Sequence, residues 1–251
     1  MDIATLSGIL AGFGMALGAV FLGFAPEKFV HLPSLMFVVG GTCATILLTF
    51  PVEDVRQAVR AGIQAFAARN IPVRDAVAAI AHLAEISHKE GIKALEKIHT
   101  HNPVLSKAAR LIADNADPDL MRDTLAIELL ALQRRRDVDI AVFSRLAASA
   151  PAMGMLGTLA GLVQILNGLK NPEAFNSGIA AAMMATFYGC LLSTLVFLPV
   201  AGKLKIRSMQ EELRLHIMFE GVKCILENNN PRLVHERLSS FLPPKERAGA
   251  R

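Results

Sequence analysis

The sequence predicts an all-α membrane protein with four transmembrane helices, a cytoplasmic helical domain inserted between spans two and three, and a helical C-terminal tail. Of its 251 residues 53% are hydrophobic and 19% are charged, and the mean hydropathy is +0.42, too apolar for an ordinary soluble domain. No segment shows the alternating pattern of a strand. Four stretches contain no Asp, Glu, Lys or Arg and are long enough to cross a bilayer: 3–24, 32–50, 146–169 and 175–201.

The distribution of basic residues predicts the topology. Of the 26 Lys and Arg, 14 lie between residues 51 and 145 and 10 between residues 203 and 251. The positive-inside rule therefore places both polar segments, and both termini, in the cytoplasm. Met1 and Asp2 provide no basic leader for a signal peptide, so we interpret the first stretch as a retained span.

The polar segments read as helices that begin after prolines. Apolar residues at spacings of three and four predict helices over 73–87 and 92–99. A longer helix, capped by Asp117-Pro118-Asp119, is expected to run past Arg145 into span three, and the tail from 203 to about 228 extends span four. We expect four regions: 1–50 with spans one and two, 51–145 as the cytoplasmic domain, 146–202 with spans three and four, and 203–251 as the tail.

Several function classes lack the residues that they need. The spans contain no metal cluster and no nucleophile beside a base, which excludes hydrolase and redox chemistry there. Cys43 and Cys190 lie within spans, so no disulfide is expected. The net charge of +4 is explained by basic span flanks, so we predict no enzyme, no cofactor, no metal and no nucleic-acid partner.

Spans three and four instead combine prolines, hydroxyls and small residues. Pro151 removes a backbone donor and frees the carbonyl of Ala147, which near Thr158 or Thr186 would ligate a cation or a hydronium ion; Pro199 repeats the device. Tight packing at Gly154, Gly157 and Gly161 is the structural alternative. Proton relays across membranes use Asp, Glu or His, and no Asp, Glu or His lies within the hydrocarbon part of these spans, so a partner must supply the acid.

These residues resemble the MotA/PomA family, the A subunit of the flagellar motor stator, and more closely its PomA-like branch. The most specific match is the Pro-Ala-Met-Gly-Met-x-Gly-Thr-Leu-x-Gly-Leu string at 151–162. Other matches are 1–6, Val38-Val39-Gly40-Gly41, Tyr188-Gly189, Leu192-Ser193, 197–204 and Asn230-Pro231-Arg232. The resemblance covers nearly the whole chain.

The resemblance implies a ring of five A subunits around two B subunits of the MotB/PomB type in the bacterial inner membrane. Ion flow past a membrane Asp of the B subunit would rotate the ring against the C-ring protein of the flagellar rotor, and so serve flagellar rotation and chemotaxis. In this comparison 51–145 faces the rotor, and 146–202 holds the ion path and the B-subunit contact.

Residue roles follow from the same resemblance. Pro151 and Pro199 match mechanistically important prolines, and Thr158 and Thr186 match hydroxyls that line the ion path. Sodium-type members tend to have Thr before Thr186, where this chain has Ala185. Losing one oxygen ligand should penalise sodium more than a proton, so we favour H⁺ over Na⁺ as the transported ion.

The rotor-facing charges are expected at His88, Lys89 and Glu96. Lys89 and Glu96 match family positions, whereas His88 replaces a residue that is usually Arg. Because histidine here replaces an arginine, which is always charged, the unit would depend more on Lys89. Without the resemblance, each of these charges would be read as a solvated side chain on a helix.

Two alternatives remain at this point. One is the related ExbB/TolQ class of ion-driven energy transducers, which typically has three spans and an external N-terminus. The other is a membrane channel or scaffold without a mechanical role, which should tolerate Glu96→Lys.

Overall fold

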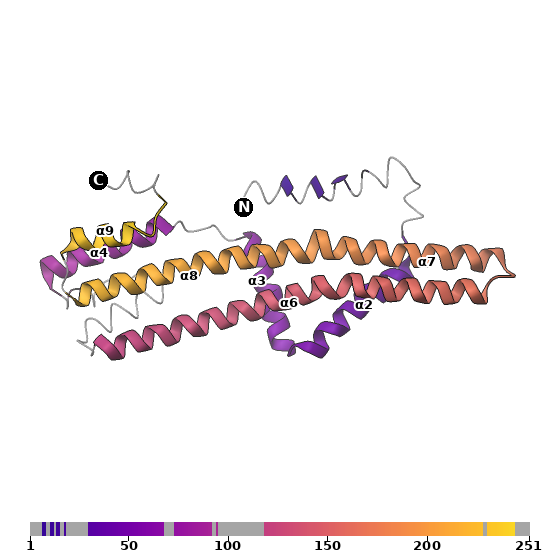
Figure 1. Ribbon diagram of the computed structural model, residues 1–251, viewed down its shortest axis with the longest axis horizontal. Helices are drawn as coiled ribbons and strands as arrows, with labels where there is room; N and C mark the ends of the chain where they lie inside the picture. Colours follow the sequence, from indigo (N-terminus) through magenta and orange to yellow (C-terminus); the bar gives the residue numbers. More distant parts are fainter. Residues whose placement is uncertain are drawn as a thin grey trace. The chain divides into compact units, whose positions relative to one another are not determined.

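The computed structural model describes residues 7–8, 11–12, 14–15, 18, 30–67, 73–91, 94, 118–227 and 230–243. Every regular element within these residues is a helix, which confirms the all-α prediction. The elements are α2 (Leu32–Thr49), α3 (Val52–Ala67), α4 (Val73–Glu90), α6 (Pro118–Asn167), α7 (Pro172–Leu191), the π-helix η3 (Leu192–Phe197), α8 (Leu198–Leu226) and α9 (Pro231–Ser239) (Figure 1).

Internal contacts divide the chain into two units. The membrane unit consists of Met1–Arg69 and Arg136–Ile206, and the second unit consists of Asn70–Arg135 and Arg207–Arg251. These limits differ from the predicted boundaries at 50, 145 and 202, which were drawn from charge alone. The difference arises because α3 and the turns of α6 just before residue 146 are polar in composition and yet pack within the membrane unit.

Three described helices are long and apolar enough to cross a membrane: Leu32–Thr49, Ala126–Asn167 and Pro172–Ile225. The last two are much longer than the roughly 20 residues that a bilayer requires, so we assign only their charge-free parts, from 146 and up to 201, to the membrane. The predicted first span falls mostly outside the described residues, as does the predicted helix 92–99, of which only Ala94 is described.

A short connection joins α6 and α7 into an antiparallel hairpin (Figure 1). The Asn171 amide donates to the Gly168 carbonyl at 2.8 Å, and the Asn171 side chain accepts from the Glu173 amide at 3.0 Å. With Pro172 at the first helical position, this cap fixes where α7 begins. Proline has no backbone N–H that would need a partner there, and the Asn171 side chain accepts a hydrogen bond from one of the free N–H groups of the first turn.

α3 packs at the end of the membrane unit. Its small residues Ala58, Ala61 and Ala65 pack against α6 and the start of α8, whose contributions include Val142, Phe143, Ala201 and Leu204. Gly62 permits this close approach, since a methyl group there would lie 2.8 Å from the Phe143 ring. The alanine stripe thus places α3 directly where the charge-free stretches end.

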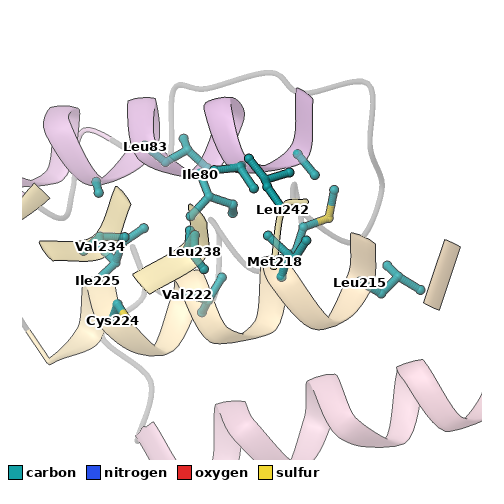
Figure 2. Close-up of a cluster of buried hydrophobic side chains, with 14 residues drawn as sticks. Ile80, Leu83, Leu215, Met218, Val222, Cys224, Ile225, Val234, Leu238 and Leu242 are labelled. Atoms are coloured by element: carbon teal, nitrogen blue, oxygen red, sulfur yellow. The ribbon is translucent and has the colours of Figure 1, made fainter. Parts of the chain in front are cut away.

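The second unit has its own apolar core. Side chains of α4, α8 and α9 interdigitate around Ile80, Val222 and Leu238 (Figure 2). Ile80, Ile217 and Leu238 are fully buried. Leu129 and Leu132 of α6 pack against the same cluster. The period-3.6 pattern of α4 predicted its inner face, where Val77, Ile80 and Ala84 are buried.

The C-terminal part differs from the prediction. α8 ends at Leu226, close to the expected end, but Asn230 then caps a further helix, α9, which we had not predicted. The Asn230 side chain accepts from the Arg232 amide at 3.0 Å, and Pro231 occupies the first turn. An Asn-Pro pair can start a helix as well as end one, and Val234 and Leu238 at a spacing of four were the available signal.

Candidate functional site

Small residues pair along the whole α6–α7 hairpin in a single antiparallel register. A methyl group added to Gly154 would lie 3.0 Å from the Ala185 carbonyl oxygen, and one added to Gly161 would lie 2.8 Å from Ala182. One added to Gly189 would lie 2.6 Å from the Ala150 carbonyl oxygen. The two backbones therefore touch, as in other membrane helix pairs rich in small residues.

This register brings the predicted ion-path residues of two helices within about one turn of each other. Ala185 and Thr186 lie against Gly154 and Gly157, and Thr158 follows one turn beyond Gly154. Counting 3.6 residues a turn from the glycine contacts, both Thr158 and Thr186 flank the seam on the same side. The hairpin thus presents two hydroxyls together on one face.

Each threonine hydroxyl donates to a carbonyl of its own helix. Thr158 donates to Met155 at 2.6 Å, and Thr186 donates to Ala182 at 3.4 Å. The hydroxyl oxygens keep their lone pairs, so each remains an acceptor for a hydronium ion or a ligand for a desolvated cation.

α2 covers the other side of the hairpin. The Ser34 hydroxyl donates to the Ala181 carbonyl at 2.9 Å, and the His31 amide donates to the Tyr188 hydroxyl at 2.9 Å. On the threonine side, Met155 and Leu162 are 61% and 50% exposed in the described part of the chain. Their exposure marks this face as one that a further apolar helix can cover.

The carbonyl freed by Pro151 has a partner that we did not predict. Pro151 lies inside α6, so the Ala147 carbonyl receives no amide hydrogen from residue 151. Instead, the Ser193 hydroxyl of η3 donates to it at 2.7 Å. Ser193 is 5% exposed and Ala147 is 4% exposed, so this bond is shielded from solvent. The carbonyl that we expected to meet an ion near Thr158 or Thr186 is therefore bonded to a neighbouring helix.

The second proline also lies beside an irregular turn. Pro199 is in the first turn of α8, immediately after the π-helix η3. The Leu198 amide donates to the Ser193 carbonyl, five residues earlier, as π-helical geometry requires. Both predicted prolines thus coincide with interruptions in the helical hydrogen-bonding pattern.

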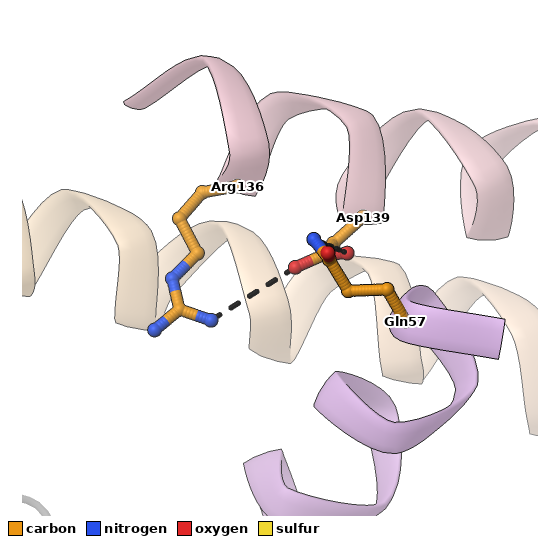
Figure 3. A network of polar contacts seen from close by, with 3 residues as sticks. All are labelled: Gln57, Arg136 and Asp139. Carbon is orange, nitrogen blue, oxygen red and sulfur yellow. Dashed lines mark hydrogen bonds and ion pairs between the residues drawn. The ribbon is translucent and has the colours of Figure 1, made fainter. Parts of the chain in front are cut away.

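A buried carboxylate lies in α6 before the charge-free stretch that begins at residue 146, and so outside the membrane-spanning segment. Asp139 is 1% exposed, accepts a hydrogen bond from the Gln57 amide at 3.3 Å, and has Arg136 at 3.9 Å (Figure 3). Burial raises the pKa of its carboxyl group, and the Gln57 hydrogen bond and the Arg136 charge oppose this shift. No sequence pattern had marked Asp139, because it lies in the charged stretch before span three, for which we predicted a long helix but no buried face.

Two of the predicted rotor-facing residues lie at the end of α4. His88 and Lys89 are exposed in its last turn, before Gly91 with φ of 85°. Glycine adopts this left-handed conformation without strain, so the helix ends there. Glu96 lies outside the described residues.

Comparison with known proteins identifies the family. The model of the MotA/TolQ/ExbB proton channel family matches residues 96–217. The chain is 34% identical to chemotaxis protein PomA of Vibrio alginolyticus over 248 residues, which are 99% of this chain and 98% of that protein. It is 33% identical to motility protein A of Aquifex aeolicus, over 96% of this chain and 97% of that protein. The chain belongs to the MotA/PomA family.

Solved structures agree with membership in the MotA/PomA family. The structure of MotAB from C. jejuni matches with a TM-score of 0.87 and 25% identity over 97% of both chains. The flagellar MotAB stator complex of Bacillus subtilis matches with a TM-score of 0.88 and 25% identity, over 98% of this chain and 99% of that one. The predicted family, a membrane-embedded stator subunit and not an enzyme, is confirmed.

Proposed function

We propose that this MotA/PomA-type subunit conducts protons along the face of the α6–α7 hairpin that carries Thr158 and Thr186. The observation that carries this proposal is the pairing of those hydroxyls on the side of the hairpin that α2 leaves open. A single apolar helix bearing a carboxylate can dock there and place its acid beside two acceptor oxygens. Such an acid is needed because the spans contain none.

The partner that supplies the acid is a B subunit of the MotB/PomB type. Two of the matching structures are MotAB complexes, which supports such a partner. In our proposal five A subunits surround two B subunits in the inner membrane, with both termini of each A subunit in the cytoplasm. The apolar face around Met155 and Leu162 is the surface that the B-subunit helix covers.

The preference for protons follows from Ala185. Its side chain is 2% exposed and lies in the seam against Gly157, beside Thr186. Sodium needs several oxygens to replace its hydration shell, whereas a proton needs one acceptor. A methyl group at 185 removes one candidate oxygen, which favours H⁺ as the coupling ion over Na⁺.

Torque is delivered by exposed charges that meet the C-ring of the rotor. One elementary charge crossing 100 mV releases about 2.3 kcal/mol. Exposed ion pairs are worth under about 1 kcal/mol each, so the rotor can release them within one ion passage. Lys89 at the end of α4, with Glu96 and His88, supplies contacts of this weak kind.

Co-expression with a candidate B subunit in a flagellated strain that lacks its own stator and is therefore paralysed tests the proposal. We expect swimming that follows external pH and is indifferent to sodium at constant proton-motive force, and Ala185→Thr should raise its sodium dependence. Wild-type speed that tracks sodium would refute the proton assignment. A chain that never restores swimming, or that conducts ions without any B subunit, would refute the proposed function itself.

A further inference from the structure

Ser193 joins the two irregular points of the membrane unit. Its hydroxyl donates to the Ala147 carbonyl of α6 at 2.7 Å, and its own carbonyl accepts from the Leu198 amide within the π-helix. Pro151 and Pro199 each follow one of these carbonyls in the chain. One residue therefore connects the proline-interrupted turn of α6 to the widened turn of η3.

The connection is needed because the site is dry. A carbonyl buried in the hydrocarbon without a donor is strongly unfavourable, and Pro151 removes the donor that a regular helix would provide. Ser193 and Ala147 are both nearly inaccessible, so water does not replace the missing bond at this site. Membrane helices commonly satisfy such carbonyls with a serine or threonine of a neighbouring helix.

The hydrogen bond between Ser193 and Ala147 lies close to the face of the hairpin that carries Thr158 and Thr186. The Ala150 carbonyl touches Gly189 one turn from the bond, and Gly154 touches Ala185 and Thr186 in the next turn. A shift of η3 against α6 at Ser193 therefore changes the height of Thr186 relative to Thr158. We propose that Ser193 is a positioning residue: its hydroxyl, by holding the carbonyl that Pro151 frees, sets the register of the two ion-path threonines. This inference rests on the proposed function of the hairpin.

Torque measured from single stator units tests this role. The speed of a bead on one flagellum rises in steps as units join the motor, so a folding defect lowers the number of steps and a positioning defect lowers their height. We expect Ser193→Ala to reduce step height about threefold, because a barrier to ion passage that rises by the roughly 0.6 kcal/mol of one hydrogen bond between membrane helices slows that passage by this factor. Ser193→Thr, which keeps the hydroxyl, should restore it.

Thr194→Ala is the matched control. The Thr194 hydroxyl is exposed and donates to the Cys190 carbonyl, four residues earlier in the same α7–η3 segment, at 2.7 Å. Its removal therefore breaks no hydrogen bond to α6. Any of three outcomes would overturn the assignment. They are steps of normal height in Ser193→Ala, an equal loss of step height in Thr194→Ala, and no recovery of step height in Ser193→Thr.

A second measurement does not depend on motility. In the purified complex with the B subunit, Ser193→Ala should lower the melting temperature by about 2–4 °C. In a Pro151→Ala background the backbone amide at 151 returns to the Ala147 carbonyl, so the same serine change should cost much less. Equal losses in both backgrounds would refute the link to Pro151. If the wild-type complex gives no torque steps, the proposed function fails while this comparison still decides the Ser193 assignment.

Discussion

At the scale of single residues, Asp139 shows how burial changes an ionisable group. Its carboxyl group is shielded by α3, and this burial raises its pKa more than Gln57 and Arg136 lower it, with Asp54 adding a further small rise. The folded protein therefore binds the Asp139 proton more tightly than the unfolded chain does. The stabilising contribution of this group is complete below its ordinary pKa of 3.8 and is lost as pH rises through the raised value.

Replacing Asp139 by Asn should therefore stabilise the protein at neutral pH. The amide keeps a hydrogen-bonding partner for Gln57 and removes a charge whose burial is unfavourable, while Arg136, with a side chain 42% exposed, stays in contact with solvent. We expect Asp139→Asn to raise the melting temperature of the detergent-solubilised protein at pH 7 and to flatten its decline above pH 4. Asp137→Asn, at an exposed carboxylate of the same helix, should change neither. A lower melting temperature for Asp139→Asn at pH 7 would contradict this account.

At the scale of elements, the α6–α7 hairpin depends on glycines, whose lack of a side chain lets the two helices approach closely. Its glycines let two backbones meet along the seam that Thr158 and Thr186 flank. The glycine spacing in the sequence was compatible with several packings, with α2, with a B subunit or with another copy of the chain. Only the antiparallel register selected α7 as the partner of these glycines.

Gly189→Ala should damage this packing, whereas Gly202→Ala should not. A methyl group at 189 meets the Ala150 carbonyl oxygen at 2.6 Å, while one at 202 meets nothing within 4 Å. Alanine is intrinsically better in a helix than glycine by roughly 1 kcal/mol, so the control is expected to be neutral or stabilising. Overpacking at 189 should instead cost about 1–3 kcal/mol. Thermal unfolding of both variants measures the difference, and equal melting temperatures would contradict the observed register.

At the scale of the whole molecule, function requires that ion passage in one unit acts on charges in the other. α6 and α8 are continuous helices that contribute residues to both units. The second unit is held by its own buried cluster and presents His88 and Lys89 at the end of α4. Surface charges can therefore change without loss of either core.

Charge reversal of Glu96 should separate torque from assembly. We expect Glu96→Lys to abolish or strongly reduce swimming while the protein remains in the membrane with its B subunit, because a charge whose role is to meet the rotor would contribute little to stability. Glu236→Lys, an exposed reversal on α9, is the control and should swim normally. Swimming speed and membrane abundance measure the two effects, and wild-type swimming in Glu96→Lys would remove Glu96 from the rotor-facing set.

The helical class, the family and the three spans among the described residues were predictable from the sequence, whereas the identity of the ion-path residues stays a prediction. Charge-free stretches, proline spacing and the string at 151–162 are properties of neighbouring residues, and the bilayer imposes its length and polarity on them directly. The pairing of Ser193 with Ala147, the burial of Asp139 and the common face of Thr158 and Thr186 were decided only by the tertiary structure. Each of these three features involves residues of different helices. How those helices lie against each other depends on the register of their packing, which the sequence of neighbouring residues does not encode.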